Sequence, residues 1–215
     1  MTTKQIFDQF KIPPGLQKHM YTVAGIGKYI CDHWQGPSIN KDIVVKSLLI
    51  HDLGNLIKFD LSPGAKIYDP ILEKPEWKEF QSKMKKKYGS SAHQATVQMT
   101  KEITDDQLII KLINSMDSTN LESIFHASWE EKICEYADMR VTPNGITSMS
   151  ERLDDIHERY KEHYADWADE SQLATNKDFG NRIEQELQQN TSKDIIEITE
   201  EKIATYLVKL TDLEI

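Results

Sequence analysis

The chain has 215 residues, of which 39% are hydrophobic and 28% charged, and its formal charge at pH 7 is −9. This composition is typical of a globular protein, and the length suits one sizeable domain with or without a small extension. The acidic balance argues against a general nucleic-acid binder, because such proteins normally present a basic surface.

The sequence shows no sign of export, membrane insertion or a disulfide framework. Its first residues, MTTKQIFDQF, lack the apolar core of a signal peptide, and no apolar stretch approaches the roughly 20 residues of a membrane span. Cys31 and Cys134 lie far apart among apolar residues, without CxxC spacing, which indicates two buried, reduced thiols. We therefore expect a cytoplasmic protein that does not enter a membrane.

Almost every patterned stretch predicts an α-helix, and no stretch alternates long enough to predict a strand. The predicted helices cover residues 16–34, 41–53, 76–88, 91–101, 104 onward, 128–141, 148–168, 170–189 and 199–213, and residues 58–72 are expected to form a loop. We expect an all-α fold, with a compact bundle over residues 1–168 and a C-terminal helical extension over residues 169–215 that packs on it.

Polar residues mark the starts of several of these helices. Asn40 is placed to cap the second helix, and Gly54 follows its end in the usual C-terminal position of glycine. A serine or threonine followed three residues later by glutamate or glutamine predicts capping boxes at residues 104–107, 128–131 and 148–151.

His19 lies in line with apolar residues of the first helix. Val23, Ile26 and Ile30 follow it at intervals of four, three and four residues, which places these side chains on one helix face. A histidine on such a face is either a hydrogen-bonded core residue or a ligand, and its own spacing does not decide between the two.

The stretch LLIHDLGN, residues 48–55, ends an almost wholly apolar helix with two ionisable residues, His51 and Asp52. Neighbouring helix residues point about 100° apart, yet both side chains can reach a point just beyond the helix end. The C-terminal end of a helix favours a cation, and a buried aspartate requires a positive partner. A metal ion meets both requirements, as does a neighbouring Lys or Arg.

Asp138 supplies a further carboxylate from the helix predicted over residues 128–141. Its small and apolar neighbours in YADMRV indicate that it faces inward. Together with His19, His51 and Asp52 it makes a set of two imidazoles and two carboxylates on three helices. Such a set of nitrogen and oxygen donors suits Mn²⁺, Fe²⁺, Co²⁺, Ni²⁺, Zn²⁺ or Mg²⁺ and differs from a thiolate site.

In their order and helical contexts, these four residues resemble the H…HD…D signature of the HD superfamily of metal-dependent phosphohydrolases. The similarity includes the pair VA four residues after His19, LG directly after Asp52 and a tyrosine-alanine-aspartate motif ending at Asp138. It covers about residues 16–160 of the chain.

The resemblance implies an HD-domain helical bundle in which His19, His51, Asp52 and Asp138 bind one divalent metal. The metal would polarise a phosphoryl group and lower the pKa of a bound water that attacks phosphorus. Asp52 would additionally orient that water as a base, which makes it the candidate catalytic residue. The implied activity is hydrolysis of a phosphomonoester or phosphodiester in a small, nucleotide-like substrate.

Subfamilies with two metals carry further histidines between the paired motif and the final aspartate. His93 falls in a suitable interval, and we place it near the substrate phosphate. His126 is the other candidate, for which a surface or capping role is favoured. Asn114 and Asp117 stand where a further histidine often lies, and this departure argues against a second metal.

Lys58 and Arg140 are the candidate cations for the substrate phosphate. Lys58 lies in the loop that follows the paired motif. Arg140, two residues after Asp138, is expected to form a salt bridge with Asp154 or Asp155, or to reach the phosphate.

Two other functions stay open. One is a metal- or nucleotide-binding regulatory module with little turnover. The other is a di-iron oxygenase, as in some HD relatives, which requires more histidine ligands than this sequence supplies. The C-terminal helix over residues 199–213 either packs on its own domain or mediates a homodimer.

Overall fold

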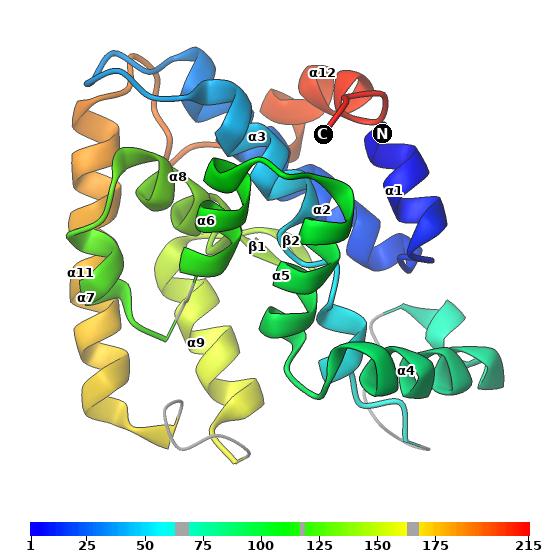
Figure 1. Ribbon diagram of the computed structural model, residues 1–215. Helices are drawn as coiled ribbons and strands as arrows, with labels where there is room; N and C mark the ends of the chain where they lie inside the picture. Colours follow the sequence, from blue (N-terminus) through cyan, green and yellow to red (C-terminus); the bar gives the residue numbers. More distant parts are fainter. Residues whose placement is uncertain (63–68, 117–118, 163–167) are drawn as a thin grey trace.

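A computed structural model describes residues 1–62, 69–116, 119–162 and 168–215 (Figure 1). Its described residues form helices and one hairpin of two short antiparallel strands, which confirms the all-α class. The helices are α1 (Thr3–Gln9), α2 (Pro14–Asp32), α3 (Lys41–Ile50), the 3-10 helices η1 (Asn55–Lys58) and η2 (Pro70–Glu73), α4 (Pro75–Tyr88), α5 (Ala92–Ile103), α6 (Gln107–Ser115), α7 (Leu121–Phe125), α8 (Trp129–Asp138), α9 (Met149–Tyr160), α11 (Glu170–Gln189) and α12 (Glu200–Leu210). The strands are β1 (Val141–Thr142) and β2 (Gly145–Ile146), too short to show an alternating pattern in the sequence.

Helices α2, α3 and α8 pack against one another in the middle of the bundle. Their contributions to the core include Met20, Ile26, Leu48 and Ile133, each completely buried. Burying an aliphatic side chain of this size stabilises a fold by roughly 1.5–3 kcal/mol. The relative positions of these three helices are therefore determined by the core, and the same three helices carry the predicted metal ligands.

Helix α3 ends at Ile50, three residues earlier than predicted. His51 occupies its C-cap position with helical dihedral angles, and Asp52 lies in the turn beyond it. The prediction that both residues belong to the last turn of the helix is wrong in this detail. Both side chains nevertheless lie at the end of the helix, where the predicted site requires them.

Gly54 has a different role from the predicted helix terminator. Its φ of −83° is accessible to any residue, so the left-handed conformation of a terminating glycine is absent here. A β-carbon at this position would lie 2.7 Å from the backbone nitrogen of Thr96 and even closer to the carbonyl oxygen of Ala92. Glycine is needed because the start of α5 approaches the backbone of the His51–Asp52 turn closely.

Three of the predicted caps are confirmed and one is wrong. Asn40 caps α3, and complete capping boxes begin α8 at Ser128 and α9 at Ser148. No box forms at residues 104–107. The carboxylate of Asp106 instead accepts hydrogen bonds from the N–H groups of Leu108 and Ile109. Helix α6 therefore begins at Gln107, two residues later than a helix capped by Thr104 would begin.

The ends of α8 and α9 also differ from the predicted bounds. Helix α8 ends at Asp138 because the chain enters the hairpin, where Gly145 adopts a positive φ of 127°. Helix α9 ends at Tyr160, and residues 163–167 of the stretch predicted as its end lie outside the described residues. Helix α11 has the bounds that the sequence predicts.

The C-terminal helices pack on the rest of the chain. Helix α11 contacts α7, α8 and α9, and α12 lies along α2. Ile183, Leu187 and Ile203 from these two helices join the common core. The termini lie side by side in Figure 1, and the N–H of Ile215 donates to the carbonyl oxygen of Met1 at 3.0 Å. The division into domains at residue 168 stays a prediction.

Both cysteines are buried and free, as predicted. Burial raises the pKa of the Cys31 thiol to about 12 and that of Cys134 well above its usual value, so neither is a thiolate at neutral pH. No helix within the described ranges combines the length and apolar character needed to cross a membrane. The cytoplasmic location stays a prediction.

Candidate metal centre

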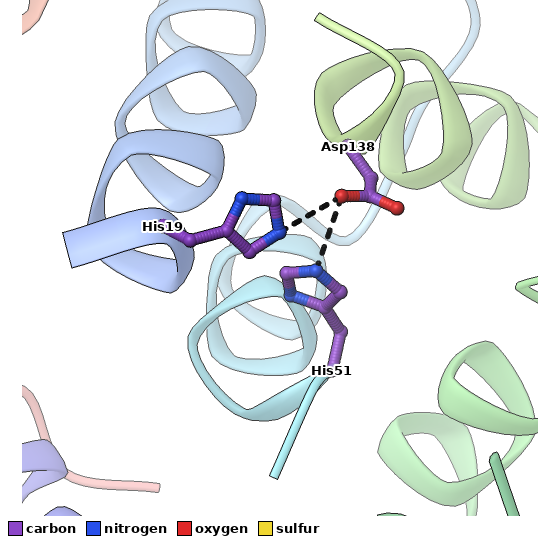
Figure 2. Close-up of side chains that lie close together, drawn as sticks. All are labelled: His19, His51 and Asp138. Atoms are coloured by element: carbon purple, nitrogen blue, oxygen red, sulfur yellow. Dashed lines mark ion pairs between the residues drawn. The ribbon is translucent and has the colours of Figure 1, made fainter. Parts of the chain in front are cut away.

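His19, His51 and Asp138 converge from α2, the end of α3 and the end of α8 (Figure 2). The Nε2 atoms of His19 and His51 lie 3.1 Å and 3.3 Å from the same oxygen, Oδ1 of Asp138. One ligand atom from each of the three residues lies within 4.8 Å of the others, an arrangement that can hold a metal ion. Three of the four predicted ligands are thus brought together by helices that are distant in sequence.

Asp52 lies beside these three residues. Its Oδ2 is 3.4 Å from Nε2 of His19 and 3.7 Å from Nε2 of His51. The carboxylate therefore faces the same two nitrogens as Asp138, although it is not part of the tighter set. Its role as a ligand or base stays a prediction.

A backbone hydrogen bond orients the ring of His51. Its Nδ1 lies 2.7 Å from the carbonyl oxygen of Leu48, which can only accept, so Nδ1 carries the proton. In the neutral imidazole, the lone pair for a metal is then on Nε2, the atom that faces Asp138.

The four groups shift one another's pKa. Burial alone would lower the pKa of His51, but the charges of Asp52 and Asp138 raise it to about 9. Burial alone would also lower the pKa of His19, but its hydrogen bonds to Asp138 and Asp52 raise it. Without a metal, the two carboxylates therefore favour the protonated form of both histidines.

The two carboxyl groups shift in the opposite direction. Burial alone would raise the pKa of Asp52, but the charge of His51, the hydrogen bond from His19 and the charge of Lys58 lower it to about 2. Burial likewise opposes the shift at Asp138, whose pKa lies well below its usual value because of the same two histidines. Both aspartates are ionised at neutral pH and are available to a cation.

The residues present fit a divalent metal. Nε2 of His51 and Oδ1 of Asp138 are buried and lie 3.3 Å apart, but neither makes a well-aligned hydrogen bond, although buried polar atoms are normally satisfied. An ion between them would satisfy both atoms. The donors are nitrogen and oxygen only, as predicted, which suits Mn²⁺, Fe²⁺, Co²⁺, Ni²⁺, Zn²⁺ or Mg²⁺.

The cluster is partly open to solvent. The side chain of His51 is 2% exposed, whereas those of His19, Asp52 and Asp138 are 17%, 18% and 21% exposed. Solvent thus reaches three of the four side chains, while His51 is covered by its neighbours.

Thr96 of α5 supports the turn that carries His51 and Asp52. Its hydroxyl accepts a hydrogen bond from the N–H of Gly54 at 2.9 Å and donates to the carbonyl oxygen of Ala92 at 3.0 Å. The side chain is almost fully buried. Sequence reasoning missed this residue, since a threonine inside an amphipathic helix carries no signal of its own.

Lys58 ends η1 with an exposed side chain, and its charge is close enough to Asp52 to lower the pKa of that carboxyl.

The other predicted histidines lie outside the candidate metal centre. His93 is exposed in the first turn of α5 and does not belong to the metal-ligand set, and His126 is exposed at the C-cap of α7. Asn114 is exposed on α6, and Asp117 lies outside the described residues. Phosphate contacts of Lys58 and His93 stay predictions.

Arg140 requires a correction. Its guanidinium is buried and donates to the carbonyl oxygens of Ile195 and Ile196 at 2.7 Å and 2.9 Å, to Tyr136 Oη at 2.6 Å and to the carbonyl oxygen of Thr147. These bonds occupy all three nitrogens, so Arg140 ties the C-terminal segment to α8. It forms neither of the two expected salt bridges and is withdrawn as a phosphate ligand.

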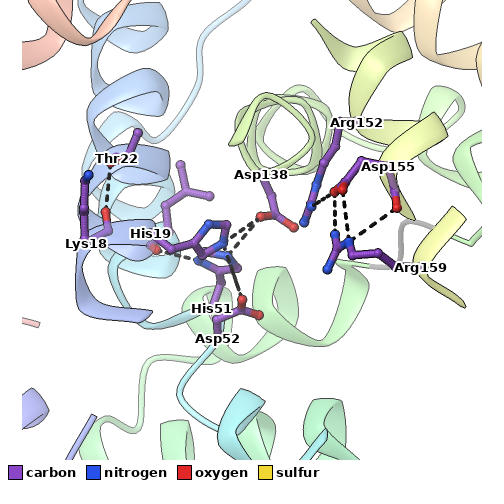
Figure 3. A network of polar contacts seen from close by, with 10 residues as sticks. Lys18, His19, Thr22, His51, Asp52, Asp138, Arg152, Asp155 and Arg159 are labelled. Carbon is purple, nitrogen blue, oxygen red and sulfur yellow. Dashed lines mark hydrogen bonds and ion pairs between the residues drawn. The ribbon is translucent and has the colours of Figure 1, made fainter. Parts of the chain in front are cut away.

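Two other arginines lie near the cluster. Arg152 and Arg159 of α9 share the carboxylate of Asp155, and Figure 3 shows this group on the side of Asp138 away from His19. Asp155 lies three residues after Arg152 and four residues before Arg159, a spacing that predicts a row of ion pairs on a helix. That this row lies on the Asp138 side of the candidate metal centre could not be read from the sequence, because it depends on how α9 packs.

Comparisons of the chain with protein families, with curated proteins and with solved structures found no significant match.

Proposed function

We propose that the protein is a divalent-metal-dependent phosphohydrolase of the HD type, acting on a small phosphate ester such as a nucleotide. The observation that carries the proposal is the convergence of Nε2 of His19, Nε2 of His51 and an oxygen of Asp138, which lie within 4.8 Å of one another and come from α2 and the ends of α3 and α8. This geometry supports the ligand set that the resemblance implies.

The residue roles follow from the positions of the side chains. His19, His51 and Asp138 would hold the metal, with Asp52 beside them as a further ligand or as the base that orients the attacking water. When bound, a divalent cation polarises a phosphoryl oxygen and lowers the pKa of a coordinated water. Asp52 can accept a hydrogen bond from that water and orient it, because its carboxylate is ionised and partly exposed.

Lys58 would supply positive charge on the Asp52 side of the cluster. Its side chain is exposed, and its charge is felt by the Asp52 carboxyl. An exposed lysine at this place can move toward an incoming phosphate without breaking a described hydrogen bond or ion pair.

The proposal is tested by incubating the purified protein with p-nitrophenyl esters and nucleotides in the presence of Mn²⁺, Co²⁺, Ni²⁺ or Mg²⁺. We expect metal-dependent release of product that a chelator stops. Asp52→Asn should lower kcat by at least about a hundredfold, the usual contribution of a general base. Lys83→Gln, on exposed α4, is the matched control and should retain full activity.

Full activity of Asp52→Asn, or product formation that survives the chelator, would contradict the proposal. Tight nucleotide and metal binding without any product would instead support the regulatory module.

A further inference from the structure

Arg152, Asp155 and Arg159 form a closely bonded group on α9. Oδ2 of Asp155 lies 3.0 Å from Nη1 of Arg152 and 2.6 Å from Nη2 of Arg159, and Nε of Arg159 lies 3.1 Å from Oδ1. The two arginine side chains are only 13% and 24% exposed. With two guanidinium groups and one carboxylate, the group has one net positive charge.

The start of α9 is fixed close to the end of α8. The capping box of Ser148 and Glu151 begins the helix, and the carbonyl oxygen of Thr147, just before it, accepts a bond from Arg140. On another face of α9, Lys177 of α11 pairs with Asp154 at 2.6 Å. These contacts hold α9 against α11 and against the chain that follows α8.

The position of Arg152 differs from that of an ordinary surface arginine. In Figure 3 its guanidinium extends toward Asp138 from the side opposite to the histidines. Its Nε is buried and has no hydrogen-bond partner, an arrangement that costs free energy unless a ligand satisfies it. The planar guanidinium fork is suited to the oxygens of a phosphate.

The charges around the centre indicate which phosphate ester fits. A divalent metal held by the two carboxylates of Asp52 and Asp138 has no formal net charge, whereas Lys58 and the arginine group of α9 each add one positive charge. Two positive charges match a phosphomonoester, which carries nearly two negative charges at neutral pH, better than a diester, which carries one.

We infer that Arg152 binds a non-bridging oxygen of the substrate phosphoryl group and that the substrate is a phosphomonoester. This inference rests on the proposed function, because it assigns the phosphoryl group to the same centre. Asp155 and Arg159 are positioning residues that hold the guanidinium of Arg152 in place.

The experiment titrates inorganic phosphate into the Mg²⁺-loaded protein and follows binding by calorimetry. We expect Arg152→Gln to weaken phosphate binding by about tenfold or more, the loss of a hydrogen bond to a charged group. Arg152→Lys should retain part of the phosphate affinity, because lysine keeps the positive charge but lacks the planar guanidinium that makes two parallel hydrogen bonds. Lys177→Gln, which breaks an ion pair elsewhere on α9, is the control and should bind phosphate like the wild type.

A second readout compares p-nitrophenyl phosphate with bis(p-nitrophenyl) phosphate. Loss of Arg152 should lower kcat/KM for the monoester by about tenfold more than for the diester, since a merely structural role would lower both alike. Circular dichroism shows whether Arg152→Gln is folded; if it is not, Arg152→Lys decides.

The outcomes separate the inference from the proposed function. Unchanged phosphate affinity in a folded Arg152 variant, equal losses for both esters, or no phosphate binding by the wild type would overturn the inference. Phosphate binding that depends on Arg152 in a protein that hydrolyses no ester would support the binding site and contradict only the hydrolase.

Discussion

The Nδ1–H of His51 donates a hydrogen bond to the carbonyl oxygen of Leu48 across 2.7 Å, within the last turn of a buried helix. This bond leaves Nε2 free to face Asp138, 3.3 Å away. When the ring of His51 is neutral, the backbone of α3 thereby selects the tautomer that a metal ligand needs.

Metal affinity should rise with pH. Because the pKa of His51 is raised to about 9 in the metal-free protein, a metal must displace its proton below that pH. We expect the apparent Kd for Co²⁺ to fall about tenfold per pH unit for each proton released, from neutral pH to about 9. Optical titration at several pH values measures this slope, and an affinity independent of pH over that range would contradict it.

The stability of the metal-free protein should fall over the same range. A histidine whose folded pKa exceeds its unfolded value of 6.5 contributes stability below 6.5, and that contribution disappears as pH rises through about 9. Chemical unfolding at several pH values tests the sign. A metal-free protein that becomes more stable between these pH values would show that the carboxylates do not hold protons on the histidines.

Thr96→Val should loosen the turn that carries His51 and Asp52. The substitution keeps the shape of the side chain and removes the oxygen that accepts from the N–H of Gly54, leaving a buried donor unpaired. We expect a loss of about 1–3 kcal/mol in the free energy of unfolding, with weaker metal binding. Thr96→Ser, which keeps the hydroxyl, is the control for urea unfolding with and without metal. Equal stability of the valine and serine variants would refute the role of this bond.

Arg140→Gln should destabilise the attachment of the C-terminal segment. Arg140 donates to the carbonyl oxygens of Ile195 and Ile196 from a buried position, so its loss leaves both without this donor. We expect a loss of about 3 kcal/mol and faster amide exchange in α12. Lys83→Gln, on the exposed face of α4, should change stability by less than about 1 kcal/mol. If the amides of α12 exchange as slowly in Arg140→Gln as in the wild type, Arg140 does not attach the C-terminal segment.

The sequence predicted the parts of the fold that depend on local chemistry. Helical periodicity indicated the bounds of α11, and capping residues such as Ser128 and Ser148 indicated the starts of α8 and α9. Wrong details arose where two local signals competed. At residues 104–107 the carboxylate of Asp106 caps the helix in place of Thr104 and accepts from the N–H groups of Leu108 and Ile109.

The convergence of His19, His51 and Asp138 could be predicted because the types and order of these residues carry chemical information. The side chain of Arg140, by contrast, could not be placed, since two of its acceptors are backbone oxygens about 55 residues further along the chain. The row of Arg152 and Arg159 is visible as a pattern, but its direction depends on packing between α9 and its neighbours.

The central claim is that His19, His51 and Asp138 form a metal centre, and metal stoichiometry tests it most directly. Elemental analysis of protein purified without chelator should find about one divalent metal per chain, the number that a single mononuclear centre holds. His51→Ala and Asp138→Asn, both folded by circular dichroism, should lose the metal, whereas Lys83→Gln should keep it. Metal content that is unchanged in the two ligand variants would contradict the account.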